Sequence, residues 1–173
     1  NFILIKNAIN EKYLNDLKEK LVNFSKTEPS SFHKMLEGCP NFHREIDENA
    51  SKKYSVKSVR HSYYFFRWNK DLFNLYGTMN SIWSSIKHLG GLDNDSFIKN
   101  TPKDGIVDRI QVVQYPADTG YIEPHQHDPI NQRLIISVYM SRKSKDYNNG
   151  GTYFFNKENK AIEVEDRIEI GDV

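Results

Sequence analysis

The chain has 173 residues, of which 38% are hydrophobic and 13% aromatic, enough for one hydrophobic core. Its 24 lysines and arginines nearly balance its 23 aspartates and glutamates, so no broad field of one sign can hold nucleic acid or an anionic membrane. No apolar run approaches the roughly 20 residues that span a bilayer, and the apolar start at residues 2–5 is too short for a signal peptide. These features predict a soluble single-domain chain without a nucleic-acid or membrane partner.

Cys39 is the only cysteine of the chain. A single cysteine excludes an internal disulfide and a zinc-thiolate cage, and it fits the reducing cytoplasm. Between Gly38 and Pro40 we interpret it as a structural thiol rather than a nucleophile. The cysteine content therefore favours a cytoplasmic protein whose chemistry lies elsewhere.

The first half of the chain predicts two helices. Residues 2–5 are expected to form a short strand, and from Asn10, an N-cap residue type, apolar residues recur at helical spacing. A second apolar stripe begins at Leu72 and is stopped by Gly90 and Gly91. Between these helices, residues 25–57 predict a long irregular loop.

Strand patterns dominate the rest of the chain. Aromatic residues crowd residues 59–68, and such residues favour a half-buried pleated surface. Further strands, separated by Pro, Gly, Asp and Asn, are predicted at 109–115, 134–140, 152–155 and 161–164. Helices followed by a run of strands favour an α+β domain whose later part is a sandwich or barrel.

The segment Pro124-His125-Gln126-His127-Asp128 carries the sharpest chemical signal. Alternate residues of a strand point to one face, so His125 and His127 can aim two imidazoles at a single ion if the segment is extended. Imidazole is a ligand for iron, zinc, copper and nickel. Asp128 is the one carboxylate within reach, but it would face away from His127 unless a bulge at Pro129 turned it round. Two hydrogen-bonded surface histidines are the alternative that the spacing leaves open.

Several features around this segment follow one another in a characteristic order. A Tyr-Pro turn at residues 115–120 precedes Pro124-His125, and an apolar segment, Gly150-Gly151-Thr152 and Gly171-Asp172 follow. This order resembles the 2-oxoglutarate and Fe(II)-dependent oxygenases, notably their prolyl-hydroxylase-like and phytanoyl-CoA-hydroxylase-like branches. The resemblance covers residues 107–173, with weak support from the N-terminal strand and helix. It implies an α+β fold with a double-stranded β-helix core, a cupin-like jelly roll, and N-terminal helices packed on one sheet.

The resemblance also implies that two regions of the chain have different roles. Residues 1–106 would form a helical, substrate-binding region, and residues 107–173 the first part of the β-helix core. The family's third iron ligand, a histidine, and its 2-oxoglutarate-binding arginine would follow Val173. Because the chain starts without Met and stops within an apolar pattern, we expect it to be incomplete at its C-terminus.

Fe(II) and 2-oxoglutarate are the cofactors that the resemblance implies. The family's first iron ligand maps onto His125, and its second is normally a carboxylate two residues later, where this chain has His127. The second ligand is therefore either His127 or Asp128. The implied reaction uses O₂ and 2-oxoglutarate to hydroxylate a C–H bond of a small-molecule or peptidyl substrate, with halogenation as a minor alternative if no acid ligand is present.

Three further residues are candidates for binding the cofactor. Gln111 and Tyr115 share one face of a predicted strand, and either could donate a hydrogen bond to the keto acid. Arg133 could neutralise a carboxylate of cofactor or substrate. The alternatives are polar residues satisfied within a barrel wall for the first two and a solvated surface residue for Arg133.

Two other classes of protein compete with the oxygenase. A cupin-type metalloenzyme also uses a His-x-His pair on a barrel strand, but the glutamate usual a few residues later is absent, since Pro129, Ile130 and Asn131 follow here. A non-catalytic β-rich binding module would use exposed aromatics, with the histidine pair incidental. The cupin-type metalloenzyme would not need 2-oxoglutarate, which distinguishes it from the oxygenase. The binding module would keep its function after metal chelation, which distinguishes it from both enzymes.

Overall fold

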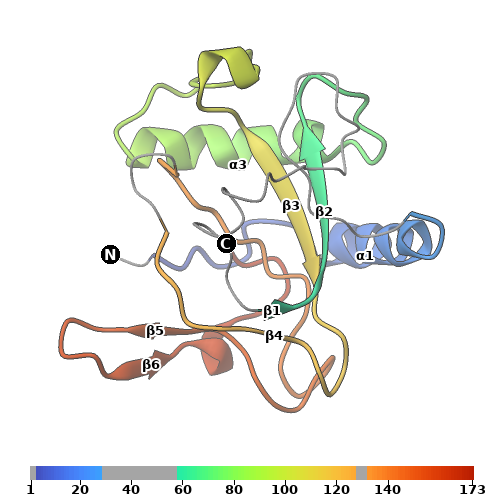
Figure 1. Ribbon diagram of the computed structural model, residues 1–173, viewed down its shortest axis with the longest axis vertical. Coiled ribbons are helices and arrows are strands. Elements are labelled where there is room, and N and C mark those ends of the chain that lie inside the picture. Colours follow the sequence, from blue (N-terminus) through green and yellow to red (C-terminus); the bar gives the residue numbers. More distant parts are fainter. Residues whose placement is uncertain (1–2, 29–57, 128–131) are drawn as a thin grey trace. The chain divides into compact units, whose positions relative to one another are not determined.

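The computed structural model describes residues 3–28, 58–127 and 132–173 (Figure 1). Most of the predicted loop at 25–57, and the candidate ligand Asp128, lie outside the described residues. The chain divides into two compact units. The first combines Asn1–Lys26 with Ile136–Val173, and the second is Thr27–Ile135.

Helix α1 (Glu11–Ser25) is the main helix of the first unit. It starts where the sequence predicts, because the Asn10 side chain accepts a hydrogen bond from the Tyr13 N–H at 3.1 Å. The helix buries Leu14, Leu17 and Leu21, which are spaced three and four residues apart on one face. The prediction of an amphipathic helix after Asn10 is confirmed.

Strands β5 (Tyr153–Phe155) and β6 (Ala161–Glu163) form an antiparallel pair in the first unit and confirm the last two predicted strands. The predicted strand at 134–140 is wrong, because in that segment only Tyr139 exchanges backbone hydrogen bonds, with Gly171 and Asp172. The strand predicted at 2–5 is likewise wrong for the described residues 3–5. There, Ile5 pairs with Val173 in both directions, at 2.7 and 3.0 Å, without a longer ladder.

The turn Gly171-Asp172 joins the two ends of the first unit. Gly171 has a φ of 96°, and a Cβ on it would lie 2.2 Å from the Ile9 carbonyl oxygen, so only glycine fits. The fully buried carboxylate of Asp172 accepts hydrogen bonds from Lys6 Nζ and from the N–H groups of Asn7 and Glu169, the latter two at 2.9 Å. Through these hydrogen bonds, Asp172 links the N-terminal segment around Lys6 and Asn7 to the C-terminal segment.

This carboxylate should make the first unit sensitive to acid. Burial alone raises the pKa of Asp172, but the hydrogen bonds from Lys6, Asn7 and Glu169 outweigh burial and hold the pKa below its ordinary value. A pKa depressed on folding contributes stability above the unfolded value of about 3.9, and this contribution disappears as pH falls further, through the folded pKa. Asp172→Asn should therefore cost about 2 kcal/mol at pH 7 and weaken the acid destabilisation below about pH 4.

Hydrogen exchange of the Ile5, Ile9 and Val173 amides at pH 7 and pH 3 would measure this effect, after correction for intrinsic exchange rates. The matched control is Asp16→Asn, which removes only an exposed pair with Lys12 on α1. Equal protection in wild type and Asp172→Asn at both pH values would contradict the role given to Asp172.

The second unit is built on one long extended segment. Its first part, β1 (Ser58–Val59), pairs antiparallel with β4 (Tyr121–Ile122). Its second part, β2 (His61–Phe66), pairs antiparallel with β3 (Arg109–Gln114), with His61 opposite Gln114. The strands predicted at 59–68 and 109–115 are confirmed, and β3 and β4 follow one another along the same partner segment.

Helix α3 (Leu75–Leu89) confirms the second predicted helix. It begins three residues after Leu72, because the Asp71 carboxylate accepts hydrogen bonds from the N–H groups of Leu75 and Tyr76, both at 2.8 Å. It ends at Gly90, as the sequence predicts. The Tyr76 hydroxyl donates to the Phe65 carbonyl oxygen at 2.6 Å and so links α3 to β2.

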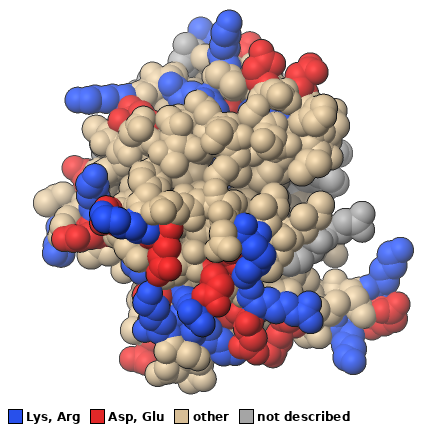
Figure 2. Space-filling model, turned by 180° about the vertical axis from the view of Figure 1, so that it is seen from behind, with Lys and Arg blue, Asp and Glu red and all other residues tan. Residues whose placement is uncertain are grey.

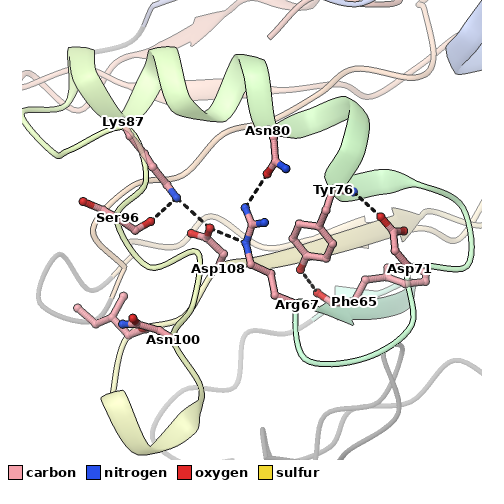
Figure 3. A network of polar contacts seen from close by, with 10 residues as sticks. Phe65, Arg67, Asp71, Tyr76, Asn80, Lys87, Ser96, Asn100 and Asp108 are labelled. Carbon is pink, nitrogen blue, oxygen red and sulfur yellow. Dashed lines mark hydrogen bonds and ion pairs between the residues drawn. The ribbon is translucent and has the colours of Figure 1, made fainter.

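A buried network of charges connects α3 with the end of β2 and the start of β3 (Figure 3). The Asp108 carboxylate accepts hydrogen bonds from Lys87 Nζ and Arg67 Nε, both at 2.8 Å, and the Asp108 and Lys87 side chains are only 3% and 2% exposed. Lys87 also donates to the Ser96 carbonyl oxygen, and Arg67 donates to Asn80 Oδ1 at 2.9 Å. Asp108 is thus the shared anion of two cations immediately before β3.

Every sheet formed by the described residues has two strands, and none closes into a barrel, so the double-stranded β-helix stays a prediction. Within the described part of the chain, no helix is both long and apolar enough to cross a membrane. On the face drawn in Figure 2, lysines and arginines are interspersed with aspartates and glutamates, in keeping with the formal net charge of +1.

Candidate metal-binding site

The predicted turn between β3 and β4 directs the chain toward the histidine pair. Its backbone closes through the Gly120 N–H, which donates to the Pro116 carbonyl oxygen at 2.8 Å, while Asp118 adopts a left-handed φ of 63°. A Cβ on Gly120 would lie 2.6 Å from the same Pro116 oxygen, so a side chain would break the turn. The Tyr-Pro and Gly signals of the sequence therefore correspond to a tight turn that leads into β4.

His125 and His127 follow β4 on a segment that forms no regular strand. Both side chains are exposed. Their ring centroids lie 4.7 Å apart with an angle of 63° between the ring planes. The two imidazoles are therefore neighbours and are not splayed to opposite sides of the chain.

The partners of the two rings determine which nitrogen is left for a metal. His125 Nδ1 lies 2.9 Å from the Glu123 carbonyl oxygen, and His127 Nδ1 contacts Gln132 Oε1. A carbonyl oxygen only accepts, so each Nδ1 carries the proton and donates it. In the neutral form of each ring, Nε2 then carries the lone pair that a metal ion requires.

The separation of the rings fits two ligands of one ion. A metal about 2.1 Å from Nε2 lies about 3.2 Å from the ring centroid, so two imidazoles at right angles on one ion have centroids about 4.6 Å apart. The observed separation is 4.7 Å. The donor set also fits, because neutral imidazole suits ferrous iron and its borderline neighbours.

The described residues alone do not complete a metal site. Within residues 3–28, 58–127 and 132–173, no group of three His, Cys, Asp or Glu side chains is placed to hold an ion. The candidate Asp128 lies outside these residues.

The three predicted cofactor-binding residues have different surroundings. Gln111 Nε2 donates to Ser62 Oγ and to the Tyr64 hydroxyl, both at 3.2 Å, so its amide is engaged across the β2–β3 pair. Tyr115 and Arg133 are exposed and make no hydrogen bond or ion pair to another described side chain. The structure brings none of the three into hydrogen-bonding contact with His125 or His127, as far as described residues go.

Gln132 is the residue near the site that the sequence did not single out. It contacts His127 from five positions further along the chain. A glutamine in the polar run before an apolar segment carries no spacing signal of its own, so only the folded chain reveals the contact.

Comparison of the chain with protein-family models, curated proteins and solved structures gives no match. The resemblance of residues 107–173 to the 2-oxoglutarate-dependent oxygenases therefore stays a prediction from the sequence motifs.

Proposed function

We propose that this protein is a non-haem Fe(II) dioxygenase that uses O₂ and 2-oxoglutarate to hydroxylate a C–H bond of a small-molecule or peptidyl substrate. The observation that carries the proposal is the pair of adjacent imidazoles at His125 and His127, each with Nδ1 on an oxygen acceptor. The order of motifs across residues 107–173 supports a double-stranded β-helix around this pair. The single cysteine fits a cytoplasmic location.

His125 would hold the iron through its Nε2 atom, together with either His127 or Asp128. Bound iron would supply the binding and activation of O₂ and of the keto acid. An imidazole ligand brings no negative charge to the ion, which favours an anionic chelator such as 2-oxoglutarate at the remaining positions. The Glu123 carbonyl oxygen and the Gln132 side-chain oxygen contact the two rings, and Gln111, Tyr115 and Arg133 are the proposed contacts of the cofactor.

The direct test measures succinate formed from 2-oxoglutarate by the full-length protein, with and without Fe(II). We expect succinate formation that needs iron, stops on chelation and resumes when iron is restored. Iron binding without 2-oxoglutarate consumption would overturn the proposal in favour of a cupin-type metalloenzyme. An absence of iron binding would overturn it in favour of a β-rich binding module.

A further inference from the structure

We propose that His127, rather than Asp128, is the second metal ligand, and that Gln132 is a positioning residue that holds His127 ready to bind through Nε2. The inference rests on the metal site of the proposed function, but it does not depend on 2-oxoglutarate chemistry. It assigns a ligand that the sequence motif leaves open and a role to a residue outside that motif.

The arrangement of the rings favours His127 as a ligand. Its ring lies 4.7 Å from that of His125, the separation derived above for two imidazoles on one ion. A His127 that did not bind metal would leave an imidazole beside the ion, with its Nε2 lone pair available. In this proposal the two histidines bind one ion together.

The contact with Gln132 favours one tautomer of the neutral His127 ring. The Gln132 side-chain oxygen faces His127 Nδ1, so the proton stays on Nδ1 and Nε2 is free to bind. His125 Nδ1 has a corresponding hydrogen-bond acceptor, the backbone carbonyl oxygen of Glu123. Both rings therefore present the same tautomer, one through the backbone and one through a side chain that substitution can remove.

Holding an exposed ring also lowers the entropic cost of binding. An exposed side chain that is free to change rotamer loses that freedom when it binds a metal, and a preformed hydrogen bond reduces the loss. Gln132 is itself exposed, so it supports no core and its substitution should leave the fold intact. Any loss of metal affinity can therefore be assigned to the contact with His127.

The test is a titration of the metal-free, full-length protein with Co²⁺, followed by visible absorption. Gln132→Ala should weaken Co²⁺ binding by about 10- to 100-fold, the usual effect of removing the hydrogen-bond partner of a ligand histidine. Gln132→Glu keeps an oxygen acceptor and should retain most of the affinity. The matched control is Gln126→Ala, which removes an exposed glutamine between the two histidines that makes no hydrogen bond or ion pair to another described side chain.

A second readout follows the tautomer directly. In metal-free wild type, long-range ¹H–¹⁵N spectra should show His127 with its proton on Nδ1, and Gln132→Ala should shift it to a mixture of tautomers. His127→Ala should lose Co²⁺ binding, whereas Asp128→Ala should retain it.

Three results would overturn the inference: wild-type affinity in Gln132→Ala, loss of binding in Asp128→Ala but not in His127→Ala, or no Co²⁺ binding in the wild type. Normal Co²⁺ behaviour together with no succinate formation would instead overturn the proposed oxygenase and leave this inference standing.

Discussion

Replacing His125 by alanine is expected to abolish iron binding and to reduce iron-dependent succinate formation to background. In the proposed site His125 is a ligand whether the second is His127 or Asp128, so both ligand sets lose a member. The remaining single imidazole lies on an exposed segment and would hold the ion too weakly to retain it through purification. Iron content per mole of protein and the rate of succinate formation are the two measurements.

His88→Ala provides the control for removing an exposed histidine. His88 lies in the last turn of α3, and its side chain is exposed. Both variants should unfold like the wild type, because neither side chain belongs to a core. A His125→Ala protein with wild-type iron content would refute the metal site and the oxygenase together.

The regular elements could be predicted because their signals are local. The spacing of Leu14, Leu17 and Leu21 and the Asn10 cap are both readable within one helix, and the structure confirms both. The strand predicted at 134–140 is wrong because a strand forms only where a neighbouring strand supplies backbone hydrogen bonds. Ile135 is 51% exposed, and in that segment only Tyr139 finds backbone partners, more than 30 positions further along the chain.

In the candidate site, too, the features that neighbouring residues determine could be predicted, and those that depend on the folded chain could not. The histidine pair is visible in the sequence because two residues of one type two positions apart can serve one ion. The Gln132 contact is not visible, because nothing local distinguishes that glutamine from its polar neighbours. The buried network is also hidden, since Lys87 and Asp108 are 21 positions apart and each reads as an ordinary charged residue.

Asp108→Ala is expected to destabilise the second unit by about 3–5 kcal/mol, the usual cost of removing one partner of a buried ion pair. The substitution leaves Lys87 buried and Arg67 nearly so, without the anion that accepts from both. Urea unfolding followed by tryptophan fluorescence measures this loss, because both tryptophans of the chain, Trp68 and Trp83, belong to the second unit. Trp83 also reports locally, since Lys87 Nζ lies 5.0 Å from the centre of its ring.

Asp95→Ala is the matched control, because it removes an exposed aspartate and should change stability by less than about 0.5 kcal/mol. Adding Lys87→Met to Asp108→Ala removes one stranded cation, so the double variant should cost less than the sum of the two single variants by roughly 0.5–3 kcal/mol. Additive costs, or a loss below about 1 kcal/mol for Asp108→Ala, would show that the network does not stabilise the unit.

Asp108 directly precedes β3, and β3 leads through the turn at Gly120 to His125. A strong coupling between Lys87 and Asp108 would therefore mean that buried ion pairs, and not apolar packing alone, hold the start of the strand that leads to the candidate metal site.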